Sequence, residues 1–326
     1  MTALPLDAAI LDEARRFNRK LGFAPRFRVR NRWLPMLGQG LLRMSQLGSE
    51  RKLARAGIAV ERRIAAIGKA GVPVRILRPA RPPKALVLDI HGGGWVIGNA
   101  RMDDRFNAAR VQACDAAVVS VDYRLATSVP IEAIIGDCLL AARWVLDEGL
   151  PEYRGLPVFL VGESAGAHLA ASTLLELKAW PALLARVAGA VLFYGVYDLA
   201  GTPGVHAAGP DTLVLHGPSM AAALRMLTPG LDDAGRRRPP LSPLYGDLSG
   251  MPPALMFAGD IDPLREDTTQ MAARWAAAAE VELHLLPEAP HGFIHFPTRM
   301  AELVLARSHA WMTWRLARPA ETMCEE

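Results

Sequence analysis

The chain has 326 residues, of which 51% are hydrophobic and 21% are charged. This length and apolar content exclude an intrinsically disordered protein and predict one large domain, or one domain with a subdomain, around a sizeable core. The charge is uneven, because residues 1–70 hold 15 Lys and Arg against 5 Asp and Glu, a net charge of +10 in a chain whose total is +4.

The basic N-terminal segment has two explanations. It suits contact with an anionic membrane surface or an acidic ligand, but a solvated helical face in an arginine-rich sequence is the explanation we favour. No nucleic-acid-binding motif accompanies the charge, so no nucleic acid partner is expected. The N-terminus lacks the pattern of a signal peptide, and no stretch is long and apolar enough to span a bilayer. These features predict a cytoplasmic protein without stable membrane insertion.

Residues 1 to about 57 are predicted to form helices. Apolar residues recur at helical spacing from Leu6 to Leu21, and a second amphipathic stretch runs from Trp33 to Met44. No strand-like run interrupts the segment, which indicates a cap or extension packed on the main domain. Apolar side chains of the second stretch are expected to form a buried helix face or, alternatively, the wall of an acyl pocket: Trp33, Met36, Leu37, Leu41 and Met44.

From residue 58 onward, short apolar runs alternate with helical segments. Strands are predicted at 72–77, 85–90, 117–121, 158–161, 187–194, 254–257 and 281–286, and helices at 102–114, 131–148, 165–178, 268–279 and 299–316. This alternation indicates an α/β fold with a mostly parallel sheet and helices on both faces. One long insertion breaks it between residues 198 and 253, with a single helix predicted at about 218–227.

The most informative motif is Gly162-Glu163-Ser164-Ala165-Gly166. It stands between a predicted strand and a predicted helix, where the chain must turn sharply and leave the serine hydroxyl at the tip of the turn. This is the context of the nucleophile elbow of α/β-hydrolases. Because a G-x-S-x-G string also occurs by chance, a glycine-serine turn without chemistry is the alternative.

A serine nucleophile needs a base, and the base needs an orienting acid. His291 follows the predicted strand 281–286, and Asp262 follows the predicted strand 254–257, in the chain order Ser, Asp, His of α/β-hydrolases. Asp262 is favoured over Asp260, although a helix cap is its other role. His291 is favoured over His295, for which a structural role is expected.

Acyl transfer also needs hydrogen-bond donors for the oxyanion. His91-Gly92-Gly93-Gly94-Trp95 follows the predicted strand 85–90, and its glycines let backbone amides approach a carbonyl oxygen. The predicted donors are amides of this loop together with that of Ala165. Trp95 is equally suited to line the substrate pocket or to pack in the core. Phosphate binding is disfavoured, since no nucleotide-binding motif follows.

Neither a metal nor a cofactor is expected. The spacing His291-x-x-x-His295 is compatible with a metal, but the sequence shows no third ligand cluster beside it. Cys114, Cys138 and Cys324 form no C-x-x-C pair, which argues against a disulfide framework and a structural zinc site. Cys114 and Cys138 are expected to be buried.

Together these motifs resemble the hormone-sensitive-lipase-like, or family IV, esterases over residues 84–297. The resemblance rests on the motifs at residues 91–95, 122–126, 162–166, 262–264 and 291–293, in that order. It implies an eight-stranded α/β-hydrolase domain over residues 58–326, an N-terminal helical cap segment over residues 1–57, and a cap insertion at about 200–240. It also implies catalysis by Ser164, Asp262 and His291, and a role for His91 in organising the glycine loop. Within that loop it implies Gly93 and Gly94 as the oxyanion donors.

The resulting hypothesis is a serine carboxylesterase that hydrolyses short- to medium-chain acyl esters, a small-molecule substrate, and that needs no cofactor. A homodimer is also expected from the resemblance. The alternatives are an amide, carbamate or lactone hydrolase with the same residues, or a non-catalytic small-molecule-binding homologue. The sequence departs from the family pattern at Glu163, often Asp, at Thr127-Ser128, often Pro-Glu, and at Ala167, often Gly.

Overall fold

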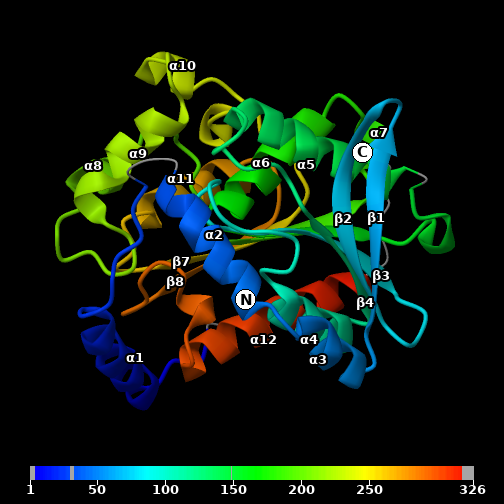
Figure 1. Ribbon diagram of the computed structural model, residues 1–326, viewed down its shortest axis with the longest axis horizontal. Coiled ribbons are helices and arrows are strands. Elements are labelled where there is room, and N and C mark those ends of the chain that lie inside the picture. The colour runs from blue at the N-terminus through cyan, green and yellow to red at the C-terminus, as the bar shows by residue number, and fades with distance from the viewer. Residues whose placement is uncertain (1–3, 30–32, 148, 318–326) are drawn as a thin grey trace.

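A single eight-stranded sheet runs through the molecule (Figure 1). The computed structural model describes residues 4–29, 33–147 and 149–317. The strand order is β1-β2-β4-β3-β5-β6-β7-β8, in which β1 and β2 are antiparallel to their neighbours and all other pairs are parallel. The strands are β1 (Ala59–Ile67), β2 (Ala70–Arg78), β3 (Ala85–Ile90), β4 (Ala116–Val121), β5 (Val158–Glu163), β6 (Val187–Phe193), β7 (Ala254–Gly259) and β8 (Val281–Leu286).

Helices cover both faces of this sheet, which explains its apolar strands. Every residue of β3, β4, β5 and β7 is buried, as expected for parallel strands with a helical layer on each side. One buried cluster joins the sheet to α5 (Ile131–Leu146), α6 (Ala165–Leu177) and α11 (Arg265–Ala276). A second joins the opposite face to α4 (Asp104–Cys114) and α12 (Arg299–Ala317). Cys114 and Cys138 lie in these layers as buried, free thiols.

Two further groups of helices pack around these layers (Figure 1), and Ile10, Ala14 and Leu53 of the first group belong to the second buried cluster. The first group precedes the sheet and comprises α1 (Ala8–Leu21), α2 (Trp33–Ser45) and α3 (Ser49–Arg55). The second follows β6 and comprises α8 (Pro203–Ala207), α9 (Met220–Leu227) and α10 (Asp233–Arg236). They meet at a short bridge, where Phe27 N donates to Val214 O at 2.6 Å and His216 N donates to Phe27 O at 2.9 Å.

The predicted α/β fold is confirmed, with three corrections. Strand β1 was missed, because its sequence carries charged residues at several positions and reads poorly as an apolar run. The segment after residue 198 holds three helices rather than one, since α8 and α10 are too short to show helical periodicity. Helix α11 begins three residues earlier than predicted, and Glu148, the predicted end of α5, lies outside the described residues.

The expectation for α2 is also wrong. Leu37, Leu41 and Met44 are 70%, 70% and 67% exposed, so they form neither a buried helix face nor an acyl wall. The side chains of Trp33 and Met36 lie outside the described residues. Among the helices that the structure describes, none has the length and apolar character needed to cross a membrane.

Candidate active site

Ser164 is the single residue between the end of β5 and the start of α6. Its backbone has φ 52° and ψ −119°, a strained conformation for a residue with a side chain, and its amide donates to Phe193 O at 2.9 Å. The turn is closed by tight packing two residues later. A Cβ atom on Gly166 would lie 1.9 Å from the carbonyl oxygen of Ile90, so only glycine fits there. The sharp turn directs the serine side chain outward from the sheet.

A continuous chain of hydrogen bonds joins Ser164, His291 and Asp262. His291 Nε2 lies 2.9 Å from Ser164 Oγ, and His291 Nδ1 lies 2.8 Å from Asp262 Oδ2. Both His291 and Asp262 are buried. The second oxygen of Asp262 accepts from the amide of Leu264 at 2.9 Å, so the aspartate also caps the turn before α11. Asp260 instead faces Arg265 on the surface, with 2.5 Å between the charged groups.

The glycine loop lies beside the serine. Gly93 has φ +100°, and a Cβ atom there would lie 2.1 Å from Ile97 O, so the loop requires glycine at this position. His91 organises the loop, as its ring stacks on Tyr123 and its Nδ1 lies 2.8 Å from Gly92 O. Burial lowers the pKa of His91, which favours the neutral ring. Ala165 opens α6, where the first amides of a helix have no intrahelical acceptor.

Trp95 connects this loop to the insertion. It is buried, and its indole Nε1 donates to His168 Nδ1 at 3.2 Å. His168 Nε2 in turn lies 2.8 Å from the carbonyl oxygen of Leu241. Complete burial lowers the pKa of His168 to about 4, so the ring is neutral and has one acceptor and one donor nitrogen, as these two contacts require. Trp95 thus both packs in the core and lines the cavity described next.

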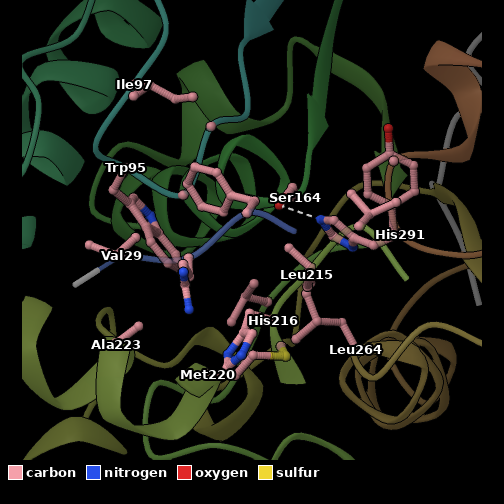
Figure 2. A pocket seen from close by; sticks show the side chains of 18 of the residues that line it. Val29, Trp95, Ile97, Ser164, Leu215, His216, Met220, Ala223, Leu264 and His291 are labelled. Atoms are coloured by element: carbon pink, nitrogen blue, oxygen red, sulfur yellow. Dashed lines mark hydrogen bonds between the residues drawn. The ribbon is translucent and has the colours of Figure 1, made fainter. Parts of the chain in front are cut away.

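A cavity of about 290 Å³ opens onto Ser164 (Figure 2). Its walls come from the segment before α2, the glycine loop with Met102, the turns after β5 and β6, the insertion with α9, and the two loops that carry Leu264 and His291. In Figure 2 the side chains of Met220 and His216 face the Ser164–His291 hydrogen bond across the cavity. Most lining side chains are apolar, among them Phe27, Val29, Trp95, Ile97, Leu215, Met220 and Leu224. Such a site suits a small ligand with an apolar body.

Behind Ser164 lies a second carboxylate–imidazole pair. His295 Nε2 lies 2.7 Å from Glu163 Oε2, and the hydroxyl of Tyr194 donates to the same oxygen at 2.5 Å. Burial alone would raise the pKa of Glu163, but the charge and hydrogen bond of His295, with the hydrogen bond of Tyr194, lower it below its usual value. Burial likewise acts to lower the pKa of His295, yet Glu163 raises it overall. The two groups therefore form an ion pair.

Asp103 completes a cluster of ligand-type side chains around this pair. Asp103, Glu163 and His295 each place one such atom within 4.8 Å of the others, which corrects the expectation that no further ligands accompany His295. His291 is not part of the cluster. Two ligands of one zinc ion stand roughly 3 Å or more apart, whereas His295 Nε2 and Glu163 Oε2 are at hydrogen-bonding distance. The geometry fits an ion pair better than a metal site.

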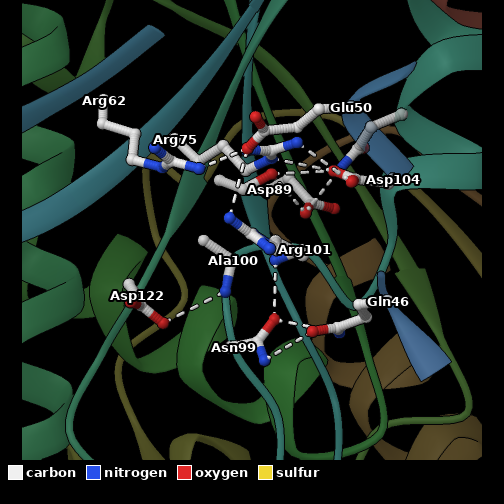
Figure 3. Close-up of polar contacts among 12 residues, drawn as sticks. Gln46, Glu50, Arg62, Arg75, Asp89, Asn99, Ala100, Arg101, Asp104 and Asp122 are labelled. Atoms are coloured by element: carbon white, nitrogen blue, oxygen red, sulfur yellow. Dashed lines mark hydrogen bonds and ion pairs between the residues drawn. The ribbon is translucent and has the colours of Figure 1, made fainter. Parts of the chain in front are cut away.

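A polar network anchors the segment that follows the glycine loop (Figure 3). The side-chain amides of Gln46 and Asn99 exchange two hydrogen bonds, of 3.0 and 2.9 Å, which ties α2 to this segment. Arg101 bonds Glu50 of α3 at 3.1 Å. Glu50 also accepts a hydrogen bond from Arg75 at 3.0 Å. Arg75 in turn donates two buried hydrogen bonds to the carboxylate of Asp104, at 3.0 and 3.1 Å. Gln46, directly after α2, and Glu50 of α3 thus anchor residues 99–101, the segment that follows the glycine loop.

The structure brings all the predicted site residues to one place. Ser164, Asp262 and His291 are hydrogen-bonded in series, and Gly93, Gly94 and Trp95 line the same cavity as Ser164. Sequence reasoning missed Tyr194 and Asp103, and it treated His295 only as a structural residue. The one sequence signal for this group was the glutamate at position 163, directly before the serine.

Comparison with known proteins identifies the class. A family model described as an alpha/beta hydrolase fold matches residues 87–295. The carboxylesterase NlhH of Mycobacterium tuberculosis is 34% identical over 251 residues, which cover 72% of this chain and 75% of NlhH. The solved esterase LipW of Mycobacterium marinum has a TM-score of 0.82 at 26% identity, and the match covers 94% of this chain and 98% of LipW.

A hormone-sensitive lipase from a metagenome library is also similar, with a TM-score of 0.72 at 25% identity over 93% of this chain and 98% of its own. The chain therefore belongs to the α/β-hydrolase family and, within it, to the hormone-sensitive-lipase-like carboxylic-ester hydrolases. The resemblance inferred from the motifs is confirmed.

Removing Arg75 tests the anchoring network. We expect Arg75→Ala to lower the free energy of unfolding by about 3–5 kcal/mol, because it leaves the buried carboxylate of Asp104 without its partner. Urea denaturation followed by circular dichroism measures the change. Lys84→Ala is the matched control, since it breaks an exposed ion pair with Asp115 and should cost less than about 1 kcal/mol. Equal effects of the two substitutions would contradict the structural role of Arg75.

Proposed function

We propose that this protein hydrolyses short- to medium-chain acyl esters through an acyl-enzyme formed on Ser164. The observation that carries the proposal is the unbroken hydrogen-bond chain from Asp262 through His291 to Ser164 at the wall of an apolar cavity. A cavity of about 290 Å³ supports a small acyl group rather than a long one.

In this mechanism His291 takes the proton of Ser164 as the hydroxyl attacks the ester carbonyl carbon. The Ser–O–C bond forms and the carbonyl π electrons move to oxygen. His291 then gives its proton to the departing alkoxide, and the C–O bond to the alcohol breaks. Water repeats the sequence on the acyl-enzyme, releasing the acid and restoring Ser164. Asp262 orients His291 and stabilises its imidazolium in both halves.

The oxyanion would be bound by the amides of Gly93, Gly94 and Ala165. Gly93 and Gly94 line the cavity next to Ser164, and the helix that begins at Ala165 adds the favourable end of its dipole. Trp95 would contribute to the substrate pocket from the same loop. No cofactor enters any of these steps.

We further propose that residues 1–57 and about 200–240 act together as a cap on a catalytic domain that spans residues 58–326. Support comes from the bridge between Phe27 and Leu215 and from the cavity wall, to which both segments contribute side chains. The cap would select the acyl or alcohol group by its shape. Amide, carbamate or lactone hydrolysis by the same residues is the alternative reaction, and it is separated from ester hydrolysis by substrate profiling.

The homodimer and the cytoplasmic location stay predictions, and peripheral membrane contact stays the alternative to a solvated basic segment. Membrane contact draws support from the exposed side chains of Leu37, Leu41 and Met44 on α2, in the basic N-terminal segment. Its measurement is cosedimentation with anionic vesicles at low and high salt. Binding that salt weakens would support membrane contact, and absence of binding at low salt would remove this alternative.

A nitrophenyl ester series from acetyl to lauroyl tests the proposed reaction. We expect activity to peak at the short end, because the cavity is small, and Ser164→Ala to lower kcat at least about 10⁴-fold. Both proteins are assayed at neutral to mildly alkaline pH, with circular dichroism as the check on folding. A folded wild type that turns over none of the esters would contradict the proposal.

The choice between the two aspartates has its own test. We expect Asp262→Asn to lower kcat by about 10⁴-fold, because the orienting carboxylate beside His291 Nδ1 is lost. Asp260→Asn is the matched control, since Arg265 is the one partner described for the Asp260 side chain, and its kcat should stay near the wild-type value. The reverse pattern would assign the acid to Asp260.

A further inference from the structure

Glu163 and His295 have no part in the reaction as written, yet they line the same cavity as Ser164 and His291. Glu163 directly precedes the nucleophile in the chain and is buried at the end of β5. His295 stands in the short turn after His291, with its side chain 36% exposed. Their hydrogen bond of 2.7 Å therefore links the strand that carries the serine to the loop that carries the base.

Tyr194 connects this pair to the base itself. Its hydroxyl donates to Glu163 Oε2, and its ring packs edge-on against the ring of His291, with 4.8 Å between the ring centroids. The ring of Phe293 also packs against the ring of Tyr194, with 5.3 Å between the ring centroids. A change in the hydrogen bond between Tyr194 and Glu163 therefore affects the position of the Tyr194 ring, against which His291 packs.

The charge on Glu163 depends on His295. Glu163 is buried beside the carboxyl group of Asp103, whose Oδ1 has no hydrogen-bond partner among the described residues. Burial, followed by the negative charges of Glu163 and Asp89, raises the pKa of Asp103 well above its usual value. Two buried carboxylates at this distance repel each other, so the pair is more stable with one negative charge than with two. The charge and hydrogen bond of His295 are the largest of the influences that keep the charge on Glu163, ahead of the hydrogen bond from Tyr194 and the charge of His291.

On the basis of the proposed esterase reaction, we propose that Glu163 and His295 are positioning residues for His291. The imidazolium of His295 keeps Glu163 ionised; the ionised carboxylate holds the Tyr194 ring against His291 and favours the imidazolium that His291 becomes during acyl transfer. The interaction is reciprocal, because the charge of His291 is among the influences that stabilise ionised Glu163.

Other charged and titratable groups surround the pair, and Asp103 responds to it directly, because the charge of Glu163 helps to raise the pKa of Asp103. Asp103, Arg105 and Arg110 face it from the start and body of α4, Asp89 and His91 from the end of β3, and Tyr194 from the end of β6. Arg105 opposes the charge of His295, and Arg110 favours ionised Asp103. A difference between variants of the pair and the wild type therefore reports on the pair together with Asp103, which is unchanged in sequence in all variants.

The test compares Glu163→Gln, His295→Gln and the double variant on the nitrophenyl ester that the wild type hydrolyses fastest. We expect each single variant to lower kcat about tenfold with KM changed less than about twofold. The acid limb of the kcat/KM profile should move to lower pH in both, because a neutral residue 163 no longer favours protonated His291. The double variant should match the single variants, since loss of His295 already lets Glu163 take up a proton.

His295→Lys keeps a cation at the half-exposed position and should restore most of kcat. His284→Gln is the matched control, because His284 pairs with Glu282 at 2.6 Å on the edge strand β8 and does not line the cavity. It should leave kcat and the pH profile unchanged. Active enzyme is counted by the nitrophenol burst, which separates a lower kcat from a smaller folded fraction.

Three results would overturn the proposal: an unchanged profile in His295→Gln, a shift of its acid limb to higher pH, or additive losses in the double variant. The first would mean that the pair does not act on His291, the second that Glu163 stays ionised without His295, and the third that the two residues act separately. Failure of the wild type to hydrolyse any ester is a different outcome, because it would contradict the proposed esterase function and would not concern the role of Glu163 and His295.

Discussion

The contact between Gly166 and the carbonyl oxygen of Ile90 fixes the geometry on which the rest of the site depends. Because no Cβ atom fits between them, the first turn of α6 lies directly against the end of β3. The nucleophile turn lies directly before Gly166 in the chain, and the glycine loop lies directly after Ile90. The serine hydroxyl and the loop amides are therefore set by backbone packing, while His291 and Asp262 reach the serine from loops after β8 and β7.

The sheet and its helices could be predicted because their signals are local. Buried parallel strands read as continuous apolar runs, and long helices show periodicity over several turns. Strand β1 was not predicted because it lies at the edge of the sheet and carries charged residues. Helices α8 and α10 were not predicted because each is about one turn long. The outward face of α2 was misjudged, since amphipathic spacing alone does not say which medium an apolar face meets.

The residues of the candidate site divide in the same way. Ser164, Asp262 and His291 were predictable because each follows a recognisable strand in a fixed order, and the glycine loop carries its own composition. The pairing of Glu163 with His295 was not, because the two residues are 132 positions apart and neither belongs to a motif that requires the other. Only the fold shows that the exposed imidazole accounts for the charge of a carboxylate buried beside the nucleophile.

The backbone hydrogen bonds between Phe27 and residues 214–216 have a consequence for altering selectivity. The two segments that contribute these residues to the cavity wall are far apart in the chain, yet backbone hydrogen bonds of 2.6 and 2.9 Å join them. Val29 from one segment and Leu215 and Met220 from the other line the same cavity, so a substitution that widens it at Val29 also changes the space that the other two side chains face. Engineering toward larger substrates must therefore redesign both segments jointly, and natural variation in one should be accompanied by variation in the other.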